Sequence, residues 1–389
     1  MCIRDRKYGF PIMLCLLMVV FWITIIGANY PSSILYDFLF WIEDKLLELF
    51  RMIKAPIWLS NCLVLGVYRV LAWVISVMLP PMAIFFPLFT LLEDLGYLPR
   101  IAFNLDRCFK KCKTCGKQAL TMCMGFGCNA AGVTGARIID SPRERLIAIL
   151  TNSFVPCNGR FPAIISIITM FFVGFNVSLG NSLLTTVILT LVILMGIFMT
   201  FTISRLLSNT ILKGMPSSFT LELPPYRKPQ IGKVLIRSIF DRTLFVLGRA
   251  ISVAAPAGLV IWVLANVNYN GLSLLEYCSN FLDPIGSLMG LDGVILMAFI
   301  LGFPANEIVI PLIIMGYMAM GTITEFDNLV ELKKLLISNG WTTTTAINFI
   351  VFSLFHFPCS TTCMTIRKET GSNKWMFVAI IIPTLVGFI

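Results

Sequence analysis

The sequence has few charged residues for its length. Only 13% of its 389 residues are charged and 57% are hydrophobic, and the mean hydropathy is +0.87. Soluble globular domains carry about 25% charged residues. Several apolar runs also approach or exceed the roughly 20 residues that cross a bilayer core. The composition therefore excludes a soluble protein and predicts an all-α, polytopic membrane protein.

Three further functional classes lack their sequence patterns. No G-x-x-x-x-G-K-[ST] phosphate loop occurs, so we expect no enzyme activity and no nucleotide hydrolysis by this chain alone. The net charge is +10, but the basic residues cluster in short loops between apolar runs, which is typical of cytoplasmic loops and not of nucleic-acid binding. The twelve cysteines do not form a secreted disulfide framework, because most lie in or beside apolar segments.

The N-terminal part is predicted to form two helices. Residues 10–28 form an apolar run that is long for a signal peptide and lacks a clear cleavage site, so they predict a first transmembrane helix with a cytoplasmic N-terminus. Residues 34–54 place polar side chains on one helical face. That pattern favours an interfacial helix, and an ordinary packed helix outside the membrane fits it equally well.

The rest of the chain alternates apolar segments with polar loops. Spans are predicted at 67–92, where Pro80-Pro81 interrupt the run, and at 161–179, 183–203, 244–267, 293–320, 342–364 and 375–389. The loops at 100–117 and 137–145 are basic, which places them on the cytoplasmic side. The loop that carries Glu276, Asp283 and Asp292 contains no lysine or arginine, which indicates the opposite side.

Two short motifs occur twice. Gly-Phe-Gly-Cys-Asn at 125–129 is matched by Gly-Phe-Pro-Ala-Asn at 302–306, and Val-Pro-Cys-Asn at 155–158 by Phe-Pro-Cys-Ser at 357–360. Transporters are often built from two repeats with the binding site at paired helix breaks near the membrane centre. We therefore expect two repeats that pair Asn129 with Asn306 and Cys157 with Cys359.

Charge distribution conflicts with simple crossings near these motifs. If residues 120–136 crossed fully, the arginine-rich loop after them would lie outside, and residues 146–157 are too short to span. Half-crossing, re-entrant segments remove both conflicts. Broken backbone at membrane depth is tolerated only where it lines a cavity or is buried in protein.

The predicted breaks carry residues that suit a metal ion. A break frees carbonyl groups and exposes helix ends, and cysteine favours borderline or soft metals over Na⁺ or Mg²⁺. An ionisable residue at membrane depth, such as Glu307, is a functional candidate by default. The candidate metal ligands are Cys128, Asn129, Cys157, Asn158, Cys359, Asn306 and Glu307.

Other metal-ligand types in the chain favour simpler interpretations. Met122 and Met124 are expected to pack rather than bind metal. His356, the single histidine, is more often a structural group than a ligand. Cys108, Cys112 and Cys115 lie in a basic loop with the spacing of a cluster-binding loop, but no matching enzyme domain surrounds them. A transient metal relay or plain loop thiols fit them better.

Taken together, these motifs make the chain resemble the ferrous iron transport protein B (FeoB) family. The resemblance covers nearly the whole chain from Gly9. Its longest stretches are Val-Met-Leu-Pro-Pro-Met-Ala-Ile-Phe-Phe-Pro-Leu-Phe at 77–89, Leu-Glu-Asp-Leu-Gly-Tyr-Leu-Pro-Arg at 92–100, Asp-Ser-Pro-Arg-Glu-Arg at 140–145, Pro-Cys-Asn-Gly-Arg at 156–160, Leu-Glu-Leu-Pro-Pro-Tyr at 221–226 and Phe-Ser-Leu-Phe-His-Phe-Pro-Cys at 352–359.

The resemblance implies uptake of Fe(II) across the bacterial inner membrane, with Cys128, Cys157 and Cys359 along the ion path. It implies two gate-type repeats. The expected division is a first transmembrane and interfacial helix at 1–54, a first gate-type repeat with following spans at 55–204, a cytoplasmic linker at 205–242, and a second gate-type repeat with a terminal helix at 243–389.

The family's N-terminal GTP-binding domain has no counterpart in this sequence. GTP and Mg²⁺ therefore enter only through that domain, which is expected in cis or as a separate polypeptide. Because that domain is missing, the chain is expected to be a fragment or a split protein. Residues 1–6 do not resemble the family, which favours an artificial or broken start. Membrane lipid, a small cytoplasmic accessory protein and a homo-oligomer are further implied partners, and nucleic acid is not.

Three functional classes remain open on the sequence. They are an Fe(II) permease, a transporter of another divalent metal or of a nucleoside-like solute, and a non-transporting membrane partner. A nucleoside site should bring aromatic and carboxamide groups together, whereas a metal site should bring thiols together. The cysteines at both kinds of break favour a metal.

Overall fold

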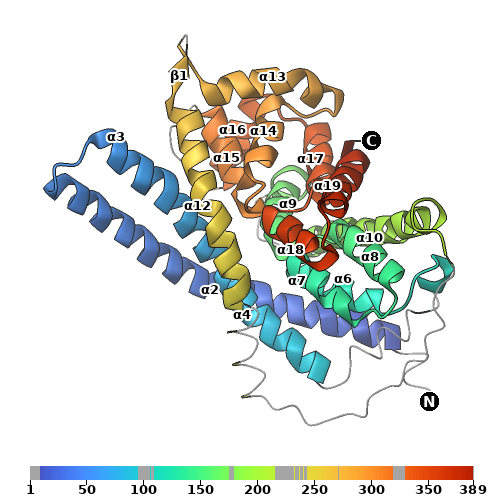
Figure 1. Ribbon diagram of the computed structural model, residues 1–389. Helices are drawn as coiled ribbons and strands as arrows, with labels where there is room; N and C mark the ends of the chain where they lie inside the picture. The colour runs from blue at the N-terminus through green and yellow to red at the C-terminus, as the bar shows by residue number, and fades with distance from the viewer. Residues whose placement is uncertain are drawn as a thin grey trace.

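The protein is almost entirely helical in the computed structural model (Figure 1). The structure describes residues 9–94, 106, 109–174, 179–214, 232, 236, 240, 243–269, 271–318 and 329–388. Cys108 and most of the predicted linker lie outside the described residues. The described strands are the two-residue pair β1 (Asn268–Tyr269) and β2 (Leu272–Ser273), which form an antiparallel hairpin around Gly271.

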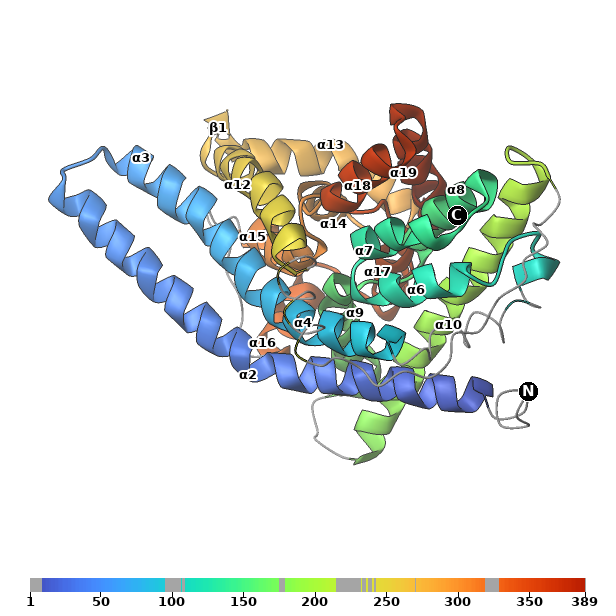
Figure 2. The same cartoon turned by 60° about the horizontal axis from the view of Figure 1, so that its bottom comes forward.

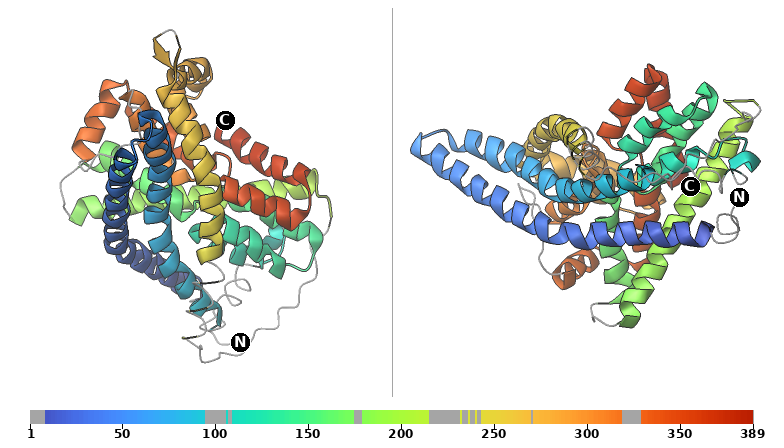
Figure 3. Two further views of the ribbon diagram at one scale, coloured as in Figure 1. Left: turned by 60° about the vertical axis from the view of Figure 1, so that its left-hand side comes forward. Right: turned by 90° about the horizontal axis from the view of Figure 1, so that it is seen from below.

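The N-terminal helices form an antiparallel pair. α2 (Gly9–Met52) is one continuous helix through Pro31, so the predicted division between residues 28 and 34 is not seen. A short turn leads through α3 (Ile57–Ser60) and η1 (Asn61–Tyr68) into α4 (Arg69–Asp94). α2 lies along α4 (Figure 3), and Arg69 forms a 2.6 Å ion pair with the buried Glu43 carboxylate of α2. Glu43, which faces the protein, therefore fixes how α2 docks.

α4 is helical through Pro80 and Pro81, where the sequence predicted an interruption. Prolines are tolerated in membrane helices when neighbouring groups satisfy the freed carbonyls. α4 and η1 cross α12 (Leu244–Asn266) at two glycines: a Cβ on Gly258 would lie 2.7 Å from the Gly66 carbonyl, and one on Gly66 2.8 Å from the Cβ of Trp262. Small residues allow such close backbone approach between membrane helices.

Two helical hairpins fold back on themselves. The first joins α6 (Gln118–Gly127) to α7 (Asn129–Gly135), and η2 (Ala136–Ile138) follows it. Lys117, just before α6, forms a 2.6 Å ion pair with Asp140, just after η2. The Lys117 ammonium also holds the pKa of the Asp140 carboxyl below its usual value. The two ends of this hairpin therefore lie on the same side, as a re-entrant segment requires.

The second hairpin joins α14 (Gly293–Leu301) through η7 (Asn306–Ile308) to α15 (Val309–Tyr317). The two chain ends of this hairpin are also joined, because the Tyr317 hydroxyl at the end of α15 donates to the Asp292 carboxylate at the start of α14. Residues 293–320 were predicted as a span. The structure instead turns them back at residues 302–305, where the chain leaves the helix.

Two broken helices run the length of the membrane domain. The first consists of α8 (Pro142–Thr151), η3 (Asn152–Phe154), η4 (Asn158–Arg160), α9 (Phe161–Ile168) and η5 (Thr169–Val173). The second consists of α17 (Thr343–Phe355) and α18 (Ser360–Thr370). Both are long and apolar enough to cross a membrane. The short segment 146–157 and the predicted span that begins at 161 are thus two halves of one crossing.

The two broken spans run in opposite directions. α8 begins beside the two chain ends of the first hairpin, which the Lys117–Asp140 ion pair joins. α18 ends at the same place, where Arg137 forms a 2.7 Å ion pair with Glu369. α17 begins beside the two chain ends of the second hairpin, where Trp341 Nε1 donates to the Tyr317 hydroxyl at 2.7 Å. η5 ends at the same place, with Phe171 stacked on Trp341. This is the arrangement of inverted repeats in transporters.

Four described segments are candidate membrane spans, and a fifth is added if the 110° bend between α13 (Leu274–Leu288) and α14 is counted as one crossing. The four are residues Ile57–Leu92, Pro142–Val173, Leu184–Asn209 and Thr343–Thr370. α10 (Leu179–Asn209), α16 (Leu329–Ser338) and α19 (Asn373–Phe388) surround the repeats (Figure 2). The chain is a polytopic membrane protein.

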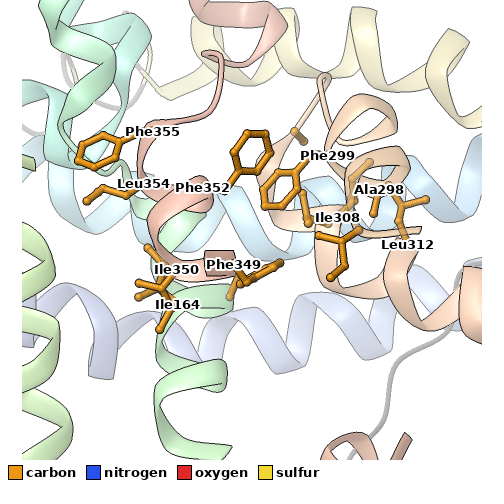
Figure 4. Packing of buried hydrophobic residues seen from close by; sticks show 14 of the residues in the cluster. Ile164, Ala298, Phe299, Ile308, Leu312, Phe349, Ile350, Phe352, Leu354 and Phe355 are labelled. Atoms are coloured by element: carbon orange, nitrogen blue, oxygen red, sulfur yellow. The ribbon is translucent and has the colours of Figure 1, made fainter. Parts of the chain in front are cut away.

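A hydrophobic core holds the breaks in place. Phe299 of α14 contacts Phe349 and Phe352 of α17, with ring centroids 5.4 and 4.9 Å apart (Figure 4). Ile164 of α9 and Ile308 of η7 are also fully buried in this cluster. Because these side chains come from both repeats, the core fixes the breaks of one repeat against those of the other.

The basic residues mark one face. Lys113 bonds to Asn209 at the end of α10, and Arg143 donates to the Leu212 carbonyl, beside the ion pairs of Lys117 and Arg137. We call the side that carries Lys113, Lys117, Arg137 and Arg143 the basic face. Positive charge favours the cytoplasmic side of membrane proteins. The residues predicted as an acidic loop are largely helical, since Glu276 and Asp283 lie inside α13, and α13 lies away from α6 and α8 (Figure 1).

Candidate functional site

Four helix breaks lie at corresponding places in the two repeats. Cys128, between α6 and α7, has φ −152° and ψ 125°, and Ala305, before η7, has φ −153° and ψ 120°. Cys157 and Cys359 are also both extended, with ψ 166° and 159°. The backbone angles of Cys128 and Ala305, the residues before Asn129 and Asn306, agree within 5°, and the pairing of the two asparagines stays a prediction.

The thiols at these breaks do not cap the helices that follow them. Each break is followed by a helix start, and none of Cys128, Cys157 or Cys359 caps its helix through its side chain. Cys128 and Cys157 are buried, and Cys359 is partly buried, with its sulfur 3.2 Å from the Thr362 hydroxyl.

The three thiols come from different segments and converge. Cys128 lies within electrostatic range of both Cys157 and Cys359, and Cys157 lies within range of Cys359. α7, which begins after Cys128, packs against α18, which begins after Cys359 (Figure 1). The sequence named all three cysteines as candidate ligands, and the structure brings Cys359 of the second repeat near Cys128 and Cys157 of the first.

Glu307 brings a carboxylate to the same place. It lies within electrostatic range of Cys157 and Cys359. η7, which carries it, packs against η4 of the first repeat. The approach is close: a Cβ added to Gly159 would lie 2.2 Å from Glu307 Oε1. Only glycine at position 159 leaves this space to the carboxylate.

The carboxamides have structural partners. With its nitrogen turned toward them, the Asn129 amide donates to the carbonyls of Gly125 at 3.0 Å and Val155 at 3.2 Å. Asn306 Oδ1 lies 3.3 Å from Nε2 of His356. Both asparagines thus bind the hairpin break to the neighbouring span break. Asn158 is half-buried at the start of η4.

His356 is packed as a structural residue. It is 1% exposed, its Nδ1 lies 2.9 Å from the Ser353 carbonyl, and its ring lies against Phe299 at 4.8 Å. Met124 also packs internally, because its sulfur fills the space beside Gly135 across the first hairpin. These positions match the structural interpretation of His356 and Met124.

Arg160 lies beside the breaks of both repeats, and the sequence patterns did not single it out. Its guanidinium is 1% exposed and donates from Nη1 to the carbonyls of Ser153 and Leu354, at 3.2 and 2.7 Å. Nη2 lies 3.3 Å from the His356 carbonyl. A buried arginine in an apolar segment is itself a functional signal. Here it joins the first repeat to the end of α17 and lies within electrostatic range of Cys157 and Cys359.

Asn152 was missed for a different reason, since nothing in its local sequence marks it. It is 1% exposed, and its Nδ2 donates to the Asn129 carbonyl at 2.9 Å. Its side chain fits between Gly125 and Gly132, whose added Cβ atoms would lie 2.7 and 2.5 Å from Oδ1. Tertiary packing alone brings it to the first break.

The site is thus a converging set of groups and not a closed metal cage. In the described part of the chain, no group of three or more histidine, cysteine, aspartate or glutamate side chains is arranged to hold a metal ion. What the breaks offer instead is three thiols, one carboxylate and the carbonyls freed where helices end.

Two protein-family models match this chain. The Gate family model, described as nucleoside recognition, matches residues 75–171 and 247–373, more than half of the chain. A second model, the ferrous iron transport protein B C terminus, matches residues 189–241. The chain belongs to the Gate family and corresponds to the C-terminal region of a FeoB protein. Both halves of the Gate match contain one hairpin and one broken span.

Curated FeoB relatives match the chain along its whole length. It is 31% identical to the Fe(2+) transporter FeoB of Staphylococcus aureus (strain MSSA476) over 100% of this chain and 57% of that protein. It is 28% identical to the FeoB of Methanocaldococcus jannaschii over 100% of this chain and 56% of that protein. The chain spans little more than half the length of these relatives. No solved structure matches the chain.

A third relative joins two proteins in one chain. It is the Fe(2+) transport protein A/Fe(2+) transporter FeoB fusion protein of Porphyromonas gingivalis, 24% identical over 100% of this chain and 50% of that protein.

Proposed function

We propose that this chain is the permease portion of a GTPase-coupled Fe(II) uptake system of the cytoplasmic membrane. The observation that carries the proposal is the convergence of Cys128, Cys157, Cys359 and Glu307 at helix breaks of two inverted repeats. The ion passes from one repeat's ligands to the other's. The names of the FeoB relatives support Fe(II) as the cargo.

The ligand types favour Fe(II) over hard cations. Thiolates select borderline and soft metals, whereas Na⁺ and Mg²⁺ prefer oxygen alone. One carboxylate and the freed carbonyls add the oxygen ligands that Fe(II) also accepts. We propose Cys128, Cys157, Cys359 and Glu307 as direct ligands. Asn158, half-buried at the start of η4, is proposed as an additional oxygen ligand.

The position of the asparagines argues against a nucleoside as cargo. Nucleoside recognition needs carboxamides free to bond with a base or sugar. Here Asn129 is engaged with two carbonyls and Asn306 with His356. We propose that both hold the breaks in place and contribute to the ion path only indirectly.

We propose that a GTPase domain outside this chain supplies the energy for transport. No phosphate loop occurs in the sequence, so GTP and Mg²⁺ are bound by a GTPase domain in cis or in trans. The name of the Porphyromonas gingivalis fusion protein supports a transport protein A homologue as an accessory partner. Robust GTP hydrolysis by the purified chain would contradict this assignment.

Cobalt binding tests the site directly. Co²⁺ bound to thiolates shows a sulfur-to-metal charge-transfer absorption, so the purified chain should show this band with Co²⁺, and Fe²⁺ should displace it. Vesicles with a FeoB GTPase domain supplied should take up labelled Fe²⁺ and no labelled uridine. Uridine uptake, or an absent cobalt band, would refute the proposal.

A further inference from the structure

Buried polar residues form a row between α6, α8 and α10. On α6 they are Gln118 and Thr121, and on α10 they are Ser204 and Ser208, one helical turn apart on one face. α8 supplies Glu144 and Thr151, two turns apart on one face, and its continuation supplies Asn152. Each of these residues is no more than 2% exposed.

Hydrogen bonds connect the middle of the row. Gln118 Nε2 donates to the Thr151 hydroxyl at 2.9 Å and lies 3.0 Å from the Ser204 hydroxyl. Gln118 thereby joins all three helices at one point. Polar side chains at membrane depth are rare, so a row of them on three facing helices needs a reason.

Oxygen atoms along the row are left without partners. Within the described residues, Gln118 Oε1, Asn152 Oδ1 and Ser208 Oγ have no hydrogen-bond partner although they are fully buried. If the row served only to hold helices together, its acceptors should be satisfied, because a buried unsatisfied oxygen is destabilising. Carbonyl and hydroxyl oxygens that point into a buried row can instead coordinate a passing cation.

The row connects the breaks to the basic face. Its inner end is Asn152, which bonds to Asn129 next to Cys128. At its outer end Cys115 and Glu144, which are both buried, lie within electrostatic range of each other. Gln118 and Cys128 are ten residues apart on α6, a rise of about 15 Å, or about half of a bilayer core. No lysine or arginine belongs to the row.

We propose that this row is the cytoplasmic half of the ion path, which carries a divalent cation from Cys128 past Gln118 and Ser204 to Cys115 and Glu144. The proposal rests on the proposed transport function. It assigns the row's oxygens to the ion's passage. It also gives Cys115 a role as the thiol that receives the ion at the cytoplasmic end.

Apolar replacements test the row while leaving the thiol site intact. Gln118→Leu and Ser204→Ala should each lower Fe(II) uptake about tenfold or more, the loss expected when a charged group loses one buried partner. The matched control is Thr202→Ala, an exposed residue two positions from Ser204, which should transport as the parent chain does. All variants should keep the thiolate–cobalt absorption. If the row is structural only, uptake per folded molecule will be unchanged in Gln118→Leu and Ser204→Ala, and the proposal falls.

Cysteine labelling tests access independently of transport. In inside-out vesicles, a charged thiol reagent should label Ser204→Cys, and Mn²⁺, which prefers oxygen ligands, should slow that labelling. Thr202→Cys should show no protection by Mn²⁺. Labelling is quantified at each position by peptide mass spectrometry. An unreactive Ser204→Cys, with the cobalt band present, would place the path elsewhere. An absent cobalt band in the parent chain would instead refute the transport site itself.

Discussion

Replacing Gly159 should displace Glu307 without removing any proposed ligand. A Cβ at position 159 would lie 2.2 Å from Glu307 Oε1 and 2.6 Å from its carboxyl carbon. Ordinary contact needs about 3.5 Å or more, so in Gly159→Ala the carboxylate must retreat by at least about 1 Å. The obstacle is the end of a flexible side chain, so the fold should survive.

The expected result is a loss of transport. A misplacement of about 1 Å in a precisely held group can lower a rate about 100-fold, so we expect Gly159→Ala to reduce Fe(II) uptake by about 10- to 100-fold. The measurement is uptake of labelled Fe²⁺ by cells in which a FeoB GTPase domain is supplied and membrane levels are matched. Gly248→Ala is the control, because an added Cβ there meets no atom within 4 Å.

A second substitution makes the reasoning refutable. Aspartate at position 307 shortens the side chain by one carbon–carbon bond, about 1.5 Å, which makes room for the new methyl group. The double variant Gly159→Ala with Glu307→Asp should therefore transport better than Gly159→Ala alone. Additive losses in the double variant, or normal uptake by Gly159→Ala, would show that the contact with Glu307 does not matter.

Three further substitutions test other parts of the structure. Cys128→Ser should lower Fe(II) uptake more than Cys62→Ser, because Cys62 is buried inside η1 away from the breaks; equal uptake by the two variants would make Cys128 a packing residue. Arg160→Gln should destabilise the protein by several kcal/mol in thermal unfolding, since each buried carbonyl left without a donor costs about 1–3 kcal/mol, whereas the exposed Arg205→Gln should have little effect. Gly258→Ala should destabilise by about 1–3 kcal/mol through overpacking against the Gly66 carbonyl, and a melting temperature like that of Gly248→Ala would show that the crossing can relax.

The sequence by itself determined the class of protein and the breaks at its paired motifs, whereas α2 and α4 run through the breaks that it predicted at residues 28–34 and at Pro80-Pro81. Apolar runs of about 20 residues indicate helices that cross a membrane. The paired Gly-Phe and Pro-Cys motifs mark places where a helix ends. The position of basic loops was enough to require re-entrant segments. The Lys117–Asp140 and Asp292–Tyr317 contacts show how those segments close.

The tertiary structure decided which of the marked residues meet. Sequence separation could not show that Glu307 lies against Gly159, or that Arg160 binds the end of α17, because the contacts join segments about 150 and 200 residues apart. Local pattern also assigned Asn129 and Asn306 as ligands, but packing gave them hydrogen-bond partners within the fold. A motif determines the local backbone conformation, whereas the contacts of a side chain depend on how the two inverted repeats pack together.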